Sequence, residues 1–64
     1  MIINDLNGIE REASYVKKTF GYEDIDDKSI KVPYVEVLLI GEHNNWKMFY
    51  PYDKFKKLNP EVKI

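Results

Sequence analysis

Residues 30–50, IKVPYVEVLLIGEHNNWKMFY, decide the fold. The stretch 30–40 is rich in β-branched and aromatic side chains, which are typical of a strand. Pro33 has no backbone N–H, so it belongs at an edge, an end or a bulge of that strand. Residues 41–45 have turn composition, because glycine and asparagine tolerate a positive φ. Residues 46–50 return to strand composition, so we expect an antiparallel hairpin.

The residues after the hairpin predict a short helix and a last strand. Pro51 ends the second strand, and Asp53 is expected to be the N-cap of one or two helical turns over 54–58. The Asn-Pro pair at 59–60 stops these turns, because the residue before a proline avoids the α region. Residues 61–64 (EVKI) alternate in polarity and are expected to add a short closing strand.

The N-terminal third allows two interpretations, and the first is a helix over 8–20. Apolar residues recur there three and four positions apart, at Leu6, Ile9, Ala13, Val16 and Phe20. Asn7 and Glu10 would form a capping pair, and Gly21 would follow the last turn. This version predicts an α+β fold, with the helix packed on a three-stranded antiparallel sheet.

The second interpretation takes Asn7-Gly8 as a type I′ turn. Residues 1–3 would then pair with part of 9–20, and 22–29 would become a long polar loop. A lone two-stranded hairpin is marginal in water, whereas further strands would give the aromatic sheet a closed core. We favour this version, which predicts a mainly β protein.

The predicted order of elements resembles a small SH3-like barrel. It consists of a hairpin, a long polar loop, a second hairpin, a helical turn (DKFKKLN, 53–59) and a last strand (EVKI, 61–64). The resemblance covers the whole chain at the level of architecture. It implies a curled antiparallel sheet with one short C-terminal helical turn, of the kind found in short phage-encoded proteins. The ALYDY-type motif of polyproline-binding SH3 domains is absent from this sequence.

The size and composition predict one small soluble domain over 1–64. The chain has 64 residues, no cysteine and a formal net charge of −1. The lack of cysteine excludes disulfides and thiolate metal sites and fits a cytoplasmic setting. The longest apolar run, 37–40, is too short to cross a bilayer, so no membrane association is expected. The abundance of lysine, isoleucine and asparagine over arginine is typical of a low-GC bacterium or its phage.

Residues that could support catalysis or bind a metal are few. His43, the only histidine, lies in a predicted turn, and both serines lie outside any nucleophile motif. Asp24, Asp26 and Asp27 suggest calcium, but the EF-hand spacing places Ser29 where glycine is required. So short a chain can hardly enclose a substrate pocket of the usual size. We expect no enzymatic activity, no metal and no cofactor.

The stretch 46–58 (WKMFYPYDKFKKL) interleaves aromatic side chains with lysines. This pattern describes a strand whose aromatic face fills the core. It also fits a protein interface, where Trp and Tyr contribute much of the binding energy, or stacking and phosphate contacts with nucleic acid. The candidate binding residues are Trp46, Lys47, Tyr50, Tyr52, Lys54 and Lys57.

Together these features favour a small non-enzymatic protein-binding module, such as a phage-encoded assembly or host-modulating factor. We expect it to bind by edge-strand pairing, and self-association is plausible because so small a domain is marginal alone. Nucleic-acid binding through the lysines of 46–58 is the alternative. A third hypothesis, an acidic mimic of nucleic acid built on Asp24, Asp26 and Asp27, is weakened by the near-neutral net charge.

Overall fold

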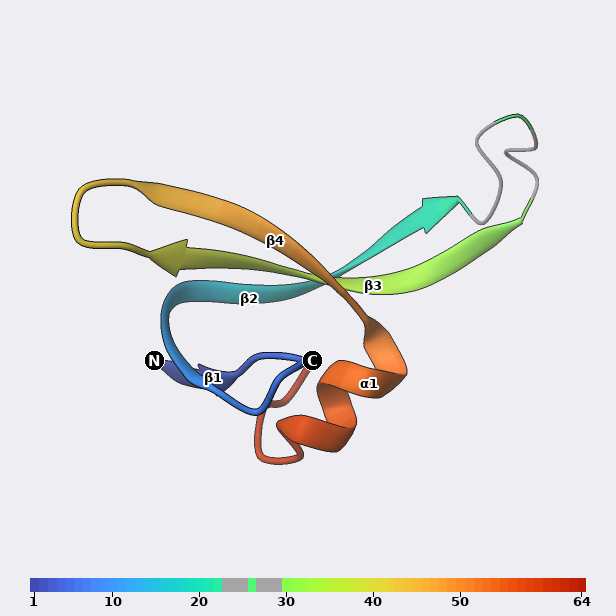
Figure 1. The fold of residues 1–64 in the computed structure, drawn as a ribbon. Helices are drawn as coiled ribbons and strands as arrows, with labels where there is room; N and C mark the ends of the chain where they lie inside the picture. The colour runs from blue at the N-terminus through green and yellow to red at the C-terminus, as the bar shows by residue number, and fades with distance from the viewer. Residues whose placement is uncertain (23–25, 27–29) are drawn as a thin grey trace.

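The computed structural model describes residues 1–22, 26 and 30–64 (Figure 1). Its four strands form an antiparallel sheet in the order β1-β2-β3-β4, and a short helix follows. The elements are β1 (Ile2–Asn4), β2 (Glu10–Tyr22), β3 (Lys31–Ile40), β4 (Asn45–Pro51) and α1 (Tyr52–Leu58). In this described part, no helix has the length and apolar content that a membrane span requires. The mainly β prediction is confirmed.

The strand interpretation of the N-terminal third is confirmed, and the helix over 8–20 is wrong. β2 pairs with β1 on one side, from Ile2↔Glu12 to Asn4↔Glu10. On its other side it pairs with β3 along most of its length. The helical pattern is local, whereas β2 pairs with β1 on one side and with the more distant β3 on the other, and this pairing overrides helix propensity. Leu6, Ile9 and Phe20, which would have formed the buried helix face, are exposed.

The turn between β1 and β2 is not the predicted type I′ turn. Among the described residues only Gly8 has a positive φ, at +77°, whereas a type I′ turn needs a positive φ at Asn7 as well. The Asp5 N–H donates to Ile9 O at 2.9 Å, and the Gly8 N–H donates to Asp5 O at 2.9 Å. These two bonds close a three-residue loop with glycine in its last, left-handed position.

The two strands of the central hairpin and its turn are confirmed. β3 pairs with β4 from Tyr34↔Pro51 to Ile40↔Asn45. Pro33 lies one residue before Tyr34, outside the pairing with β4, and Pro51 ends β4. The Gly41 N–H donates to Asn44 O at 2.9 Å in the connecting turn, which forms without a positive φ.

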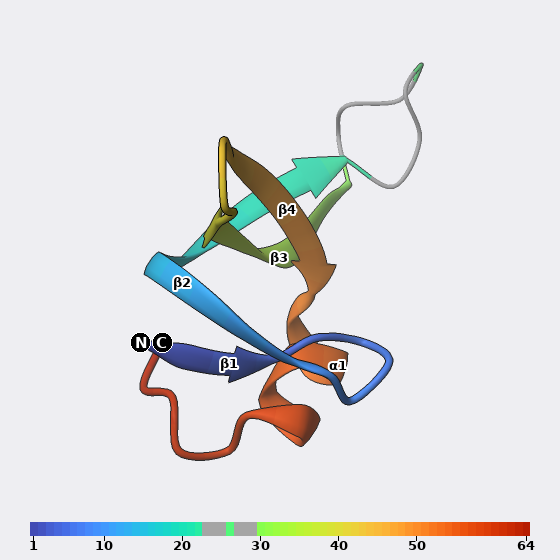
Figure 2. The ribbon, with the colours of Figure 1, turned by 60° about the vertical axis from the view of Figure 1, so that its left-hand side comes forward.

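A bulge divides the sheet into two parts. The register between β2 and β3 shifts between Ala13 and Tyr15, so Ser14 is an extra residue in β2. Before the bulge β2 pairs with β1, and from the bulge onward it pairs with β3. Figure 2 shows β2 running from β1 and α1 to the β3–β4 hairpin. The bulge allows one strand to serve both parts of a curled sheet.

The hydrophobic core lies between this curled sheet and α1. On β3 alternate residues Val35, Val37 and Leu39 are buried, and we call their face of the sheet the inner face. The rest of the core comes from the other elements and consists of Ile3, Ala13, Tyr50, Phe55 and Val62. The rings of Tyr50 and Phe55 stack with centroids 5.8 Å apart, which fixes α1 on the inner face.

The C-terminal segment differs from the prediction at both of its ends. α1 begins directly after β4, with Pro51 rather than Asp53 as its N-cap, and Asp53 lies in the first turn. Asn59 is the C-cap, as the Asn-Pro pair predicts. The closing strand over 61–64 is wrong, because these residues are not in a strand and the Val62 N–H donates to Asn59 O at 3.1 Å.

The side chain of Asn59 joins the end of α1 to the backbone of β1. It is completely buried, and its Oδ1 accepts the Asn4 N–H at 2.6 Å while its Nδ2 donates to Asn4 O at 2.8 Å. The same Nδ2 donates to Phe55 O at 3.2 Å, inside α1. This one side-chain amide therefore satisfies the backbone N–H and C=O of Asn4 in β1 and joins that strand to the end of the helix.

We predict that Asn59→Ala lowers the free energy of unfolding by about 2–3 kcal/mol, because it leaves the Asn4 N–H and carbonyl without partners. Urea denaturation followed by circular dichroism measures this loss. Asn45→Ala, at an exposed position in β4, is the control and should change stability by less than about 0.5 kcal/mol. Equal stability of the two variants would contradict the assigned role of Asn59.

Candidate functional site

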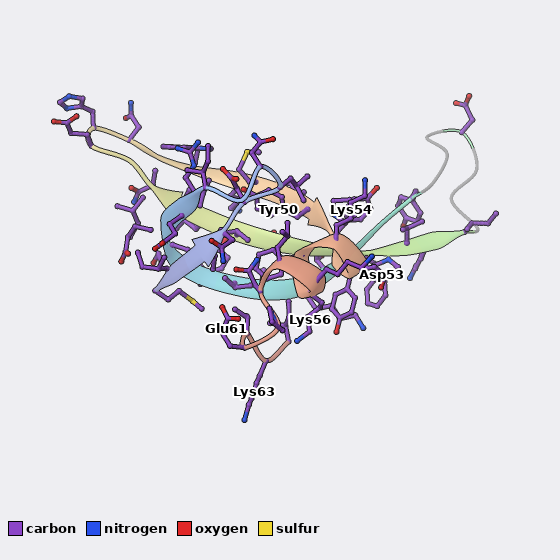
Figure 3. The ribbon with its side chains drawn as sticks, turned by 60° about the horizontal axis from the view of Figure 1, so that its bottom comes forward. Tyr50, Asp53, Lys54, Lys56, Glu61 and Lys63 are labelled. Atoms are coloured by element: carbon purple, nitrogen blue, oxygen red, sulfur yellow. The ribbon has the colours of Figure 1, made fainter. Side chains whose placement is uncertain are left out.

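Two hollows meet at Leu6 on the inner side of the sheet. The first, of about 380 Å³, lies between the β1–β2 loop and β4 and is lined by Leu6, Arg11, Trp46, Met48, Tyr50 and their neighbours. The second, of about 350 Å³, lies between the same loop and α1 and is lined by Leu6, Lys54, Lys57 and Leu58. We call the two hollows together the Leu6 groove. Figure 3 labels Tyr50, which lines the first hollow, and Lys54, which lines the second, near the junction between β4 and α1.

β4 forms the apolar wall of the groove. Trp46, Met48 and Tyr50 pair with Leu39, Val37 and Val35, so all three lie on the inner face, as their alternation predicts. Tyr50 is buried under α1, but the helix does not extend over the others, and Trp46 and Met48 remain 44% and 38% exposed. Two large apolar side chains are therefore open to solvent on the face that elsewhere forms the core. Such an exposed apolar patch provides a contact surface.

Gly41 supports the tryptophan from the β3–β4 turn. A Cβ atom at this position would lie only 2.5 Å from Cζ3 of Trp46, so the indole ring packs directly against the glycine backbone. This contact restricts the ring although nearly half of it is exposed. A restricted aromatic side chain loses little entropy when a partner covers it.

Asp5 holds the β1–β2 loop that forms the opposite wall. Its Oδ1 accepts the N–H groups of Asn7 and Ile9 at 2.9 and 3.0 Å, and its Oδ2 accepts Nε of Arg11 at 3.0 Å. The hydrogen bond from Ile9, followed by that from Arg11, lowers the pKa of the Asp5 carboxyl below its ordinary value. The loop is thereby fixed with Leu6 projecting between β4 and α1.

Two lysines form the charged end of the groove. Lys54 and Lys57 are three residues apart on α1, so they lie on the same side of the helix. Within the described part of the chain neither makes an ion pair or a hydrogen bond. Asp5 and Arg11 neutralise one another, so Lys54 and Lys57 are the charged residues among the described lining of the groove that have no ion-pair partner.

Other lysines are engaged within the protein. Nζ of Lys17 lies 3.4 Å from Oε2 of Glu36, and Nζ of Lys18 lies 4.6 Å from the centroid of the Tyr52 ring. Lys56 donates to the carbonyl of Val62. These contacts explain why Lys54 and Lys57, rather than the neighbouring lysines, are available to a ligand.

The structure brings together four of the predicted binding residues. Trp46, Tyr50, Lys54 and Lys57 all line the Leu6 groove. Lys47 lies on the opposite, outer face of the sheet, because it alternates with Trp46 and Met48. Tyr52 has a structural environment instead, since its hydroxyl donates to Ile64 O at 2.9 Å and its ring lies under Lys18.

Sequence reasoning did not find Leu6, Arg11 or Met48 as members of the site. Met48 could have been found, because the alternation that selected Trp46 and Tyr50 also includes it. The sequence holds no comparable signal for Leu6 or Arg11. Their positions depend on the three-residue loop between β1 and β2 and on the carboxylate at its centre.

The outer face of the sheet carries a separate polar cluster. The Tyr15 hydroxyl donates to Oε2 of Glu36 at 2.6 Å, and Lys17 is the ion-pair partner of the same carboxylate. The Tyr15 hydrogen bond, with a smaller contribution from Lys17, lowers the pKa of Glu36, and the same bond raises the pKa of Tyr15. The donors and the carboxylate satisfy one another, so this cluster stabilises the sheet.

An aromatic hollow of about 320 Å³ lies at the far end of β2 and is lined by Phe20, Tyr22, Tyr34, Phe49 and the backbone between them. The Tyr34 ring packs on Gly21, where a Cβ would lie 3.0 Å from Cε2 of the ring. No charged side chain lines the described part of this hollow. It offers apolar contact alone, whereas the Leu6 groove combines apolar contact with charge.

The residues considered for metal binding form no site in the described ranges. His43 is exposed in the β3–β4 turn, and no group of three possible metal ligands is present among residues 1–22, 26 and 30–64. Asp24 and Asp27, on which the calcium and acidic-mimic hypotheses depend together with Asp26, lie outside the described residues.

No family model matches this chain, and comparisons with curated proteins and with solved structures gave no significant match. What the groove can bind therefore follows from its own geometry, apolar walls and charge.

We predict that the protein loses stability in acid. The lowered carboxyl pKa values of Asp5 and Glu36 in the folded state mean that ionised carboxylates favour folding. Their contribution is complete above the ordinary carboxyl pKa of about 4 and is lost as the pH falls through the lower folded values. Thermal unfolding at neutral pH and at about pH 2.5 measures the loss.

Asp5→Asn tests the contribution of the β1–β2 loop to this loss. Asparagine retains an oxygen that accepts the Asn7 and Ile9 N–H groups but has no charge for Arg11. We expect lower stability than the wild type at neutral pH and a smaller decrease in acid. Glu42→Gln removes one charge from an exposed turn and is the control. An unchanged acid profile for Asp5→Asn would contradict the prediction.

Proposed function

We propose that this chain is a small non-enzymatic protein-binding module that takes up an extended segment of its partner along β4. The observation that supports this proposal is the position of β4. It is the last strand of the sheet, no described strand pairs with its outer edge, and Trp46 and Met48 remain exposed beside that edge. An edge strand presents unpaired N–H and C=O groups in a row, which are a template for another strand.

Strand addition would use both the edge and the Leu6 groove. Backbone hydrogen bonds to an edge give affinity, and pockets for alternate side chains give specificity. Because side chains of a strand alternate between faces, every second side chain of the added segment would lie on the inner face beside Trp46 and Met48. The added strand would be short, because β4 has seven residues and ends at Pro51, which has no N–H to donate.

We also propose that the curled sheet and helix form an SH3-like fold. The bend of β2 at the bulge and the short helix after β4 support an SH3-like arrangement, whereas the last strand of that arrangement is absent from 61–64. The lysine-rich, isoleucine-rich composition supports a phage or low-GC bacterial origin, with action in the cytoplasm as an assembly or host-modulating factor.

Nucleic-acid binding is less well supported by the geometry. A single-strand binder needs cations and stacking surfaces along one path. Here Lys47 and Phe49 lie on the outer face, whereas Trp46 and the lysines of α1 lie on the inner side. The basic and aromatic residues of 46–58 are therefore divided between two faces.

Selection from a random library of extended peptides against the whole chain tests the proposal. We expect peptides whose affinity falls about tenfold on Trp46→Ala or Met48→Ala, as for residues at the centre of an interface. Alternate backbone amides of β4 should become protected from hydrogen exchange when the peptide binds. Phe20→Ala removes a similarly exposed aromatic side chain from β2 and should leave affinity unchanged.

Two results would overturn the proposal. One is protection of β2 amides together with loss of affinity in Phe20→Ala. The other is failure to select any peptide together with binding of an oligothymidylate whose affinity falls steeply with salt, which would indicate phosphate contacts and nucleic-acid recognition.

A further inference from the structure

The two ends of the Leu6 groove differ in chemistry. At the β4 end Leu6, Trp46 and Met48 surround the first hollow with exposed apolar groups. At the α1 end Lys54 and Lys57 stand over the second hollow. A ligand that fills both hollows must therefore present an apolar group and, a short distance away, negative charge.

Among the described residues no carboxylate forms an ion pair with Lys54 or Lys57. Asp5, the carboxylate that lines the groove, is bound to Arg11 and to backbone N–H groups. Asp53 lies in the first turn of α1 but makes no ion pair with Lys54 or Lys57. Figure 3 shows Lys54 on the β4 side of α1, whereas Lys56 projects toward the C-terminal residues. Lys54 and Lys57 repel one another, and a carboxylate between them would relieve that repulsion.

A second copy of this chain does not fit the requirement. If its β4 paired with this β4, the added strand would be Asn45–Pro51, whose one charged residue is Lys47. Lys47 lies on the outer face, so such a strand would bring no carboxylate to the two lysines of α1. Charge complementarity therefore selects a partner of different sequence.

We infer that the partner segment is acidic and hydrophobic, with a large apolar side chain in the first hollow and carboxylates at Lys54 and Lys57. This inference rests on the proposed strand addition at β4. Because α1 follows the Tyr50 end of β4, the acidic residues lie at the end of the segment nearest that tyrosine. They precede the apolar residue in an antiparallel segment and follow it in a parallel one.

Trp46 provides the measurement, because it is the only tryptophan and lines the first hollow. The probes are two synthetic peptides in which alternating phenylalanine and threonine residues are flanked at both ends by either two glutamates or two glutamines, so that either strand direction is tested. We expect the glutamate peptide to bind about fivefold more tightly at low salt, since two exposed ion pairs contribute modestly. The difference should shrink as salt is raised.

Two protein variants connect this difference to α1. The double variant Lys54→Gln, Lys57→Gln should bind both peptides equally, and Lys63→Gln, at an exposed C-terminal lysine, should retain the preference for glutamate. A preference that persists in the double variant, or is lost in Lys63→Gln, would overturn the acidic assignment.

The same titration separates this inference from the proposed function. Equal binding of both peptides to the wild type, with changes in Trp46 emission and protection of β4 amides, would retain strand addition and refute an acidic partner. No binding of either peptide would refute both. A dimeric mass in the absence of peptide, with β4 amides protected, would show that the occupant is a second copy and would also overturn the inference.

Discussion

The pairing of the Asn59 side chain with the backbone of Asn4 is the constraint on which the arrangement of the site depends. These residues are 55 positions apart, and their two hydrogen bonds join the first strand to the end of the last helix. The β1–β2 loop begins directly after Asn4, so the same contact determines where Leu6 lies relative to α1. Together with the hydrogen bonds that Asp5 makes inside the loop, this contact places Leu6 between β4 and α1.

The bulge at Ser14 has a complementary effect on the other side of the molecule. It turns β2 so that its first residues lie with β1 while its later residues extend the β3–β4 sheet. The short helix then covers the inner face where Tyr50 and Phe55 stack, but it is only seven residues long. The inner face beyond it is left open at Met48 and Trp46. The exposed apolar wall is thus a consequence of a long curved sheet combined with a short helix.

The parts of the fold that could be predicted from the sequence are those whose cause is local. The hairpin of β3 and β4 follows from β-branched composition, a polar turn and a terminal proline, and it also placed Trp46 and Tyr50 on one face. The helix pattern over 8–20 failed because its competitor, pairing of β2 with two strands, involves distant residues. The same limit applies to 61–64, where a strand was expected and one buried amide from Asn59 satisfies β1 instead. In the site, Lys54 and Lys57 could be predicted because they adjoin β4 in sequence, whereas Leu6 comes from the opposite end of the chain.

Strand addition would also bear on the stability of so small a domain. A chain of this size buries a smaller fraction of its surface than a larger domain does, so its free energy of unfolding is small. A ligand that binds only the folded state stabilises it according to its concentration relative to its Kd. Backbone pairing along β4 is available to many sequences, because peptide N–H and C=O groups are common to all of them. Discrimination between partners must therefore come from side chains. Beside this edge, the side chains that can discriminate are the apolar wall at Trp46 and Met48 and the lysines of α1.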